Sequence, residues 1–135
     1  MLMKPLQHAH TRSIAVAASP ATVLAYLSDH RNLPVWAPGF APSVSERDGQ
    51  LLVRRDDGGE FAIRLEVSAE RGTVDIVSAV DPRRGAFTRV IPNGEGSEYV
   101  FTLFFDASTE PGVVAAQMTV VDDELTAVRD ACETR

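Results

Sequence analysis

The sequence has little of what several common classes of protein require. It contains one cysteine, Cys132, so no intrachain disulfide can form, and a reducing cytoplasmic setting is expected. Basic residues do not predominate, and the formal net charge of −6 argues against a nucleic-acid or anionic-membrane binder. No apolar run approaches the ~20 residues that span a bilayer, and the first residues lack the apolar core of a signal peptide. We therefore expect no nucleic-acid partner and no membrane insertion.

Familiar catalytic and cofactor motifs are also missing. The sequence has no G-x-S-x-G, no phosphate-binding glycine loop and no H-E-x-x-H. His8 and His10 form an H-x-H pair, which on a strand can bind zinc, but no third ligand follows at a useful spacing. A solvent-exposed terminus is the favoured interpretation of this pair. The sequence thus predicts no metal site and no cofactor.

The clearest positive feature is a stripe of apolar residues near the C-terminus, after Glu110-Pro111-Gly112. The steps between its members are four, three, four, three and four residues, which is typical of one face of a long helix. Such a helix must lie on another layer, and a sheet is the only large partner that the rest of the sequence offers. The stripe consists of Val114, Met118, Val121, Leu125, Val128 and Cys132.

The preceding residues predict one α+β domain spanning residues 1–135. A first strand is expected over 11–18, and Ser19-Pro20 marks the start of a short helix that runs to about Ser28. A second short helical turn is expected over 33–36, stopped by Pro38-Gly39. Short turns then join consecutive strands into an antiparallel meander. These strands are expected over 43–47, 51–55, 61–68, 73–80, 86–91 and 97–106.

Three segments, taken in order, resemble a known superfamily. They are ASPATVLAYLSD (18–29), NLPVW (32–36) and FTLF (101–104) before the long helix. This order is similar to that of the helix-grip, or SRPBCC, superfamily. It includes START lipid-transfer domains, the birch-pollen allergen, and the polyketide cyclase/dehydrase and lipid-transport group. The resemblance implies a curved sheet of about six to seven strands around the C-terminal helix, with two short helices after the first strand. It also implies a cavity between helix and sheet that opens near the second short helix.

The resemblance does not imply one activity. The first hypothesis is binding or transport of a small hydrophobic or amphipathic ligand in that cavity. One alternative is a polyketide cyclase/dehydratase-like enzyme acting on such a ligand, and the sequence leaves open whether any reaction is catalysed. Another is a protein-interaction module of the chaperone-activator kind, which would form a homodimer through an apolar patch at Val100 and Phe104 on the outer sheet face.

Candidate site residues follow from the strand and helix patterns. Trp36 either stacks on a ligand at the mouth or closes the end of the core. The expected cavity wall, which would otherwise be plain core, consists of Trp36, Phe61, Ile63, Leu65, Tyr99, Phe101, Leu103, Met118, Val121 and Leu125.

Three polar residues are weak catalytic candidates: Arg89, Tyr99 and Asp75. An inward Asp75 would have a raised pKa and act as an acid or base, although an outward position is favoured. If the last hairpin places Arg89 opposite Tyr99, both polar ends meet in the cavity and stabilise negative charge. A slip of one residue would instead place Arg89 on the outer face near Glu98, and this arrangement is favoured.

Overall fold

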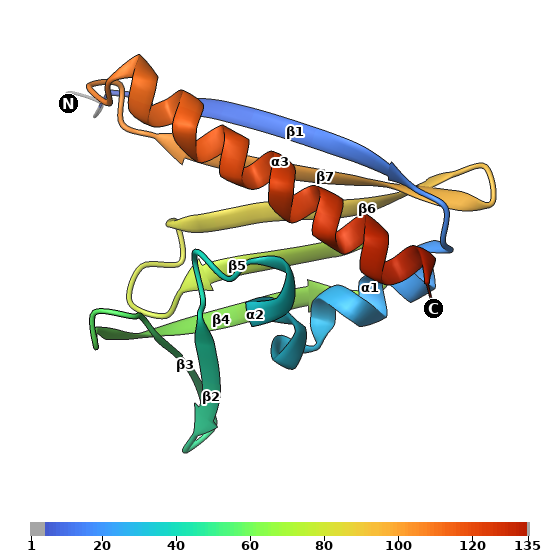
Figure 1. Cartoon of the computed structure of the whole chain (residues 1–135), viewed down its shortest axis with the longest axis horizontal. Coiled ribbons are helices and arrows are strands. Elements are labelled where there is room, and N and C mark those ends of the chain that lie inside the picture. The colour runs from blue at the N-terminus through green and yellow to red at the C-terminus, as the bar shows by residue number, and fades with distance from the viewer. Residues whose placement is uncertain (1–4, 135) are drawn as a thin grey trace.

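A long helix lies across one face of a seven-stranded antiparallel sheet (Figure 1). The structure, a computed structural model, describes residues 5–134. The fold is the α+β helix grip that the sequence predicts, with short helices after the first strand. The strands are β1 (His8–Val16), β2 (Ser43–Arg47), β3 (Gln50–Arg54), β4 (Glu60–Ser68), β5 (Thr73–Ser78), β6 (Gly85–Asn93) and β7 (Gly96–Phe105).

The strand order is β1-β7-β6-β5-β4-β3-β2, so β1 and β2 are the two edges. Between these edges the chain passes through helix α1 (Pro20–Ser28), the 3-10 turn η1 (His30–Asn32) and helix α2 (Leu33–Trp36). From β2 onward, each strand pairs with the next through a short connection, as expected for a meander. The short helices thus lie beside the long helix and contact it (Figure 1).

Local capping fixes the position of these short helices. The Ser19 Oγ accepts a hydrogen bond from the Thr22 N–H at 3.2 Å, and Pro20 occupies the first helical position. The Asp29 carboxylate ends α1 and caps η1 by accepting a hydrogen bond from the Arg31 N–H at 3.0 Å. The Asn32 side-chain amide then donates to the Tyr26 carbonyl at 2.8 Å, which ties the second helical segment to the first.

Helix α3 (Pro111–Glu133) buries the predicted apolar stripe against the sheet and the short helices. Of that stripe, Val114 is half-buried and the later members are buried. The Glu133 carboxylate accepts a hydrogen bond from the Ala17 N–H at 2.8 Å, which holds the end of α3 at the end of β1. The helix therefore lies along β1, with its C-terminal end held at the end of that strand.

Strand register decides which side chains face the helix. On β5, Val74 and Ile76 are buried on the inner face, and on β4 the inner face carries Ile63 and Leu65. The expected strand over 73–80 is too long, because the Ser78 hydroxyl accepts hydrogen bonds from the N–H groups of Val80 and Asp81 and turns the chain. Val80 is consequently 91% exposed.

The first strand starts earlier than the sequence predicts. His8 and His10 belong to β1, where they pair with Phe105 and Leu103 of β7. His8 is exposed, as the sequence predicts, whereas His10 is half-buried. The long β7 supplies backbone partners for polar residues that carry no strand pattern of their own. Among the helices that lie within residues 5–134, none has the length and hydropathy to cross a membrane.

Candidate functional site

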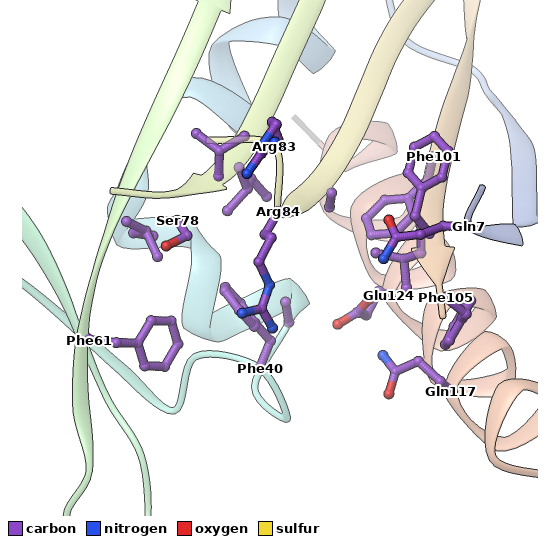
Figure 2. Close-up of a pocket in the computed structure, with 18 of the residues that line it drawn as sticks. Gln7, Phe40, Phe61, Ser78, Arg83, Arg84, Phe101, Phe105, Gln117 and Glu124 are labelled. Carbon is purple, nitrogen blue, oxygen red and sulfur yellow. The ribbon is translucent and has the colours of Figure 1, made fainter. Parts of the chain in front are cut away.

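A cavity of about 800 Å³ opens between α3, α2 and the inner face of the sheet. Its volume falls in the range of small-molecule sites, roughly 300–1,000 Å³. Its wall is mostly apolar, and Figure 2 shows Phe40, Phe61, Phe101 and Phe105 around the open space. The apolar lining residues include Leu33, Trp36, Ala37, Phe40, Phe61, Ile63, Ile76, Ala86, Phe101, Leu103 and Phe105.

Trp36 lies at the boundary between the core and the cavity. It is 3% exposed at the end of α2, and it lines the cavity. Its ring meets the Tyr99 ring edge to face, with centroids 6.5 Å apart and planes at 87°. The tryptophan therefore closes the core and forms part of the cavity wall.

An aromatic pair lines the side of the cavity near the sheet edge. Phe40, which follows α2, packs against Phe61 of β4 with ring centroids 5.7 Å apart. The Arg55 guanidinium lies over the Phe61 ring at 6.0 Å from its centroid. Aromatic edges and faces thus form a wall suited to apolar ligands.

The cavity wall also carries a buried carboxyl group that the sequence pattern did not single out. Glu124 of α3 is 6% exposed and lines the cavity, and Figure 2 shows its carboxyl pointing into it. Burial, together with the charge of Asp123, raises the pKa of Glu124 to about 7. Glu124 follows Val121 by three residues and precedes Val128 by four, which places it beside the apolar stripe. That spacing is the signal that could have found it.

Two arginines stand at the rim of the cavity, on the connection between β5 and β6. Arg83 pairs with Asp81, its Nε lying 3.1 Å from Oδ1. Arg84 is exposed, and Figure 2 shows its side chain extending from the connection toward the open space. Both side chains are exposed and lie at the cavity mouth.

The residues expected to form the cavity wall divide into two groups. Trp36, Phe61, Ile63, Phe101 and Leu103 line the cavity. The others belong to the core or pack against it and do not line the cavity. These are Leu65, Tyr99, Met118, Val121 and Leu125.

Of the catalytic candidates, Asp75 and Arg89 lie on the outer face of the sheet. Arg89 is opposite Val100 and is exposed, so it does not meet Tyr99. Asp75 is half-buried on the outer face, where its carboxylate accepts a hydrogen bond from the Thr88 N–H at 3.1 Å. Burial, with some repulsion from Glu66, raises the pKa of Asp75 above its ordinary range. The predictions that Asp75 or Arg89 points into the cavity are therefore wrong. The strand register places the adjacent residues, such as Val74 and Val90, on the inner face instead.

Tyr99 points inward but is sealed within the core. It is fully buried and does not line the cavity. Burial raises the pKa of its phenol, an effect that the neighbouring Thr88 hydroxyl partly offsets. The Thr88 hydroxyl itself donates to the Val74 carbonyl. The three candidates thus do not converge on one site.

Metal ligands do not gather in the described part of the chain. No group of three or more His, Cys, Asp or Glu side chains within residues 5–134 is arranged to hold a metal ion. His8 and His10 line a second, more open depression of about 670 Å³ beside Met118 and the start of α3. There the His10 ring packs edge to face against Phe105, with centroids 5.5 Å apart.

Comparison with known proteins places this geometry in a family. The model of the family described as polyketide cyclase / dehydrase and lipid transport matches residues 7–133. A search of curated proteins found no match. Among solved structures, the chain is similar to the ZhuI aromatase/cyclase from Streptomyces sp. R1128, with 16% identity, 96% and 95% of the two chains covered and a TM-score of 0.72.

Two further solved structures have the same fold. A START superfamily protein from Mycobacterium smegmatis has 16% identity, with 94% of this chain and 98% of that chain covered and a TM-score of 0.65. The Aha1 dimer from Colwellia psychrerythraea has 17% identity, with 93% and 96% covered and a TM-score of 0.69. At these identities the likeness shows the fold alone.

Proposed function

The chain belongs to the polyketide cyclase/dehydrase and lipid-transport family, and on this premise we propose that it binds a small hydrophobic or amphipathic ligand. The observation that carries the proposal is the cavity of about 800 Å³ lined by Trp36 and by phenylalanines from several elements. Burying apolar ligand surface there would be favourable by roughly 25 cal/mol per Å² before the costs of association. The one thiol, Cys132, is buried in the core, which suits a cytoplasmic carrier.

Native mass spectrometry of the freshly purified protein tests the proposal first. We expect a bound apolar mass that is released on denaturation and can then be identified. The second test is a ligand panel of fatty acids, sterols and aromatic compounds, followed through Trp36, the one tryptophan of the sequence. A saturable change in emission is expected, because the indole lines the cavity.

A cavity-filling variant provides the matched control. Ala86 is an inner-face residue of β6 that lines the cavity, so Ala86→Phe fills part of the space a ligand would occupy. Ala15 is exposed on the outer face of β1, so Ala15→Phe adds the same ring away from the cavity. Ligand binding should be lost in the first variant and kept in the second. Equal binding by both variants, or no binding across the panel, contradicts the proposal.

An enzymatic role is the second candidate, and it rests on Glu124 rather than on the residues that the sequence indicated. A carboxyl group with a pKa near 7 in an apolar cavity is suited to proton transfer at neutral pH. The test is turnover of aromatic polyketide-like substrates by the wild type and by Glu124→Gln. Turnover that survives the substitution unchanged would exclude Glu124 as the acid or base.

A protein-interaction role is supported by one feature of the outer sheet face. Phe104 is 47% exposed and packs edge to face on Phe87, with centroids 5.9 Å apart. Apolar surface that is exposed to solvent can mark a protein–protein interface. Analytical ultracentrifugation of the wild type and Phe104→Lys tests this role. A homodimer built on this face should dissociate in the variant, and a wild type that stays monomeric at high concentration contradicts it.

A further inference from the structure

Glu124 is a buried carboxyl that no group of the described chain satisfies. It is 6% exposed, and no hydrogen bond or ion pair to its side chain forms within residues 5–134. Its oxygens face the cavity, as Figure 2 shows. Because these oxygens open onto the cavity, a polar group of a ligand that enters it can form a hydrogen bond with them.

The protonation state of Glu124 indicates what kind of partner fits. With a pKa of about 7, a large share of the group is neutral at neutral pH. A neutral carboxyl donates one hydrogen bond and still accepts others. A hydroxyl group has the same capacity, so the two can bond to each other in both directions.

Arg84 offers a complementary group at the rim of the same cavity. Its guanidinium forms no side-chain hydrogen bond or ion pair within residues 5–134, whereas the neighbouring Arg83 is held by Asp81. The exposed Arg84 lies at the rim, and Glu124 lies inside. A free guanidinium binds a carboxylate through two parallel hydrogen bonds.

The two polar groups do not satisfy each other across the cavity. Both influences on the Glu124 carboxyl, burial and Asp123, raise its pKa, and no cation lowers it. The same cavity is also lined by apolar side chains such as Ile76 and Phe101. The cavity therefore combines a cation at its rim and a buried carboxyl with apolar side chains, beside further polar lining residues such as Ser78 and Gln117.

We propose that the cavity selects a molecule with an apolar body, a carboxylate bound by Arg84 at the rim, and a hydroxyl group bound by Glu124 inside. This inference rests on the proposed ligand-binding function and names the chemistry of its ligand. It applies to aliphatic and aromatic bodies alike, because the wall supplies both kinds of contact.

Isothermal titration calorimetry with matched probes tests the proposal. The first set is straight-chain fatty acids of several lengths, their ω-hydroxy derivatives and the corresponding alcohols. The second set is a naphthoic acid and its hydroxy derivative. We expect the best-fitting hydroxy acid to bind the wild type about tenfold more tightly than the acid without the hydroxyl.

Two variants of Glu124 separate hydrogen bonding from simple packing. Glu124→Leu should remove the preference for the hydroxyl, and it should bind the plain acid at least as well as the wild type does. Glu124→Gln keeps a donor and an acceptor, so it should retain the preference. Melting temperatures of both variants establish that each is folded. Asp123→Asn removes the same charge from an exposed neighbour and should keep the preference.

The rim is tested by comparing two arginines. Arg84→Gln should weaken the binding of the acids about tenfold and leave the affinity for the alcohols unchanged. Arg89→Gln removes the same charge from the outer face and should alter neither the affinity for the acids nor that for the alcohols.

The outcomes distinguish this inference from the proposed function. Failure of every probe to bind the wild type overturns both. Binding with no preference for the hydroxyl, or a preference that survives in Glu124→Leu, overturns the inference alone. The inference alone is also overturned if Arg84→Gln and Arg89→Gln have the same affinity for the acids.

Discussion

The rings of Trp36 and Tyr99 meet edge to face, with centroids 6.5 Å apart and planes at 87°. Trp36 belongs to the cavity wall, and Tyr99 belongs to the closed core between α3 and the sheet. The contact therefore joins the wall of the site to the most tightly packed part of the fold. Changes on the two sides of this contact should have different consequences.

The first prediction concerns Tyr99. Tyr99→Ala should lower the free energy of unfolding by about 3–5 kcal/mol, because it leaves a large cavity in the core. Tyr99→Phe should change it by less than about 1 kcal/mol, since the phenol oxygen has no well-formed hydrogen bond to lose. Chemical denaturation measures both. A loss of several kcal/mol in Tyr99→Phe would mean that the neighbouring Thr88 hydroxyl bonds strongly to the phenol.

The second prediction compares two glycines with positive φ. Gly72 has φ 72°, and a Cβ there would lie 2.5 Å from the Val90 carbonyl oxygen. Gly94 has φ 58°, but a Cβ there meets no atom within 4 Å. Gly94→Ala should cost about 1 kcal/mol of stability from backbone strain alone. Gly72→Ala should cost clearly more, and equal melting temperatures for the two variants would contradict the close packing of β6 on this turn.

The third prediction is that Glu124 makes stability fall as pH rises. The pKa of Glu124 lies near 7 in the folded protein, above the ordinary value of 4.5. Between these values the folded state binds more protons than the unfolded state, so the free energy of unfolding decreases with increasing pH. The contribution is complete below about pH 4.5 and is lost above about pH 7, and it amounts to at most about 3 kcal/mol.

Glu124→Gln isolates this contribution from the other titrating groups. Asp29, whose pKa the Arg31 side chain lowers to about 2, has the opposite effect at more acid pH, and it is unchanged in the variant. The difference in unfolding free energy between wild type and Glu124→Gln should therefore vary between about pH 4.5 and 7. A difference that stays constant across this range would show that Glu124 ionises as freely as an exposed glutamate.

The fourth prediction follows from the outer-face positions of two catalytic candidates. Asp75→Asn and Arg89→Gln should leave ligand affinity within about twofold of the wild type, since neither side chain lines the cavity. Calorimetry with a probe that binds the wild type measures this. A large loss of affinity in either variant would mean that a ligand binds on the outer face.

Much of the fold could be predicted because its signals are local. Ser19-Pro20 marks the start of α1, and the stripe from Val114 to Cys132 predicts the face of α3 that is buried. The start of β1 could not be found in this way. The polar residues at His8 and His10 extend the strand only because β7 is long enough to pair with them.

The site was less predictable because it depends on how the elements meet. Periodicity correctly placed Phe61, Phe101 and Tyr99 on the inner face of the sheet. It did not distinguish Tyr99, which is buried in the core, from the two phenylalanines that line the cavity. The spacing of Glu124 from Val121 and Val128 places it beside the buried stripe, but only the position of α3 shows that it lines the cavity. Which inner-face residues line the cavity depends on how α3 and α2 are positioned over the sheet, and a sequence pattern does not give that position.

The most direct test of the central claim is a nuclear magnetic resonance titration of the labelled protein with a probe found by the ligand panel. We predict saturable shifts of the Trp36 indole N–H and of backbone amides around Phe61 and Phe101. Amides around Arg89 and other outer-face positions should stay unchanged. Saturable shifts confined to the outer face, or no shift at Trp36, would contradict binding in the cavity.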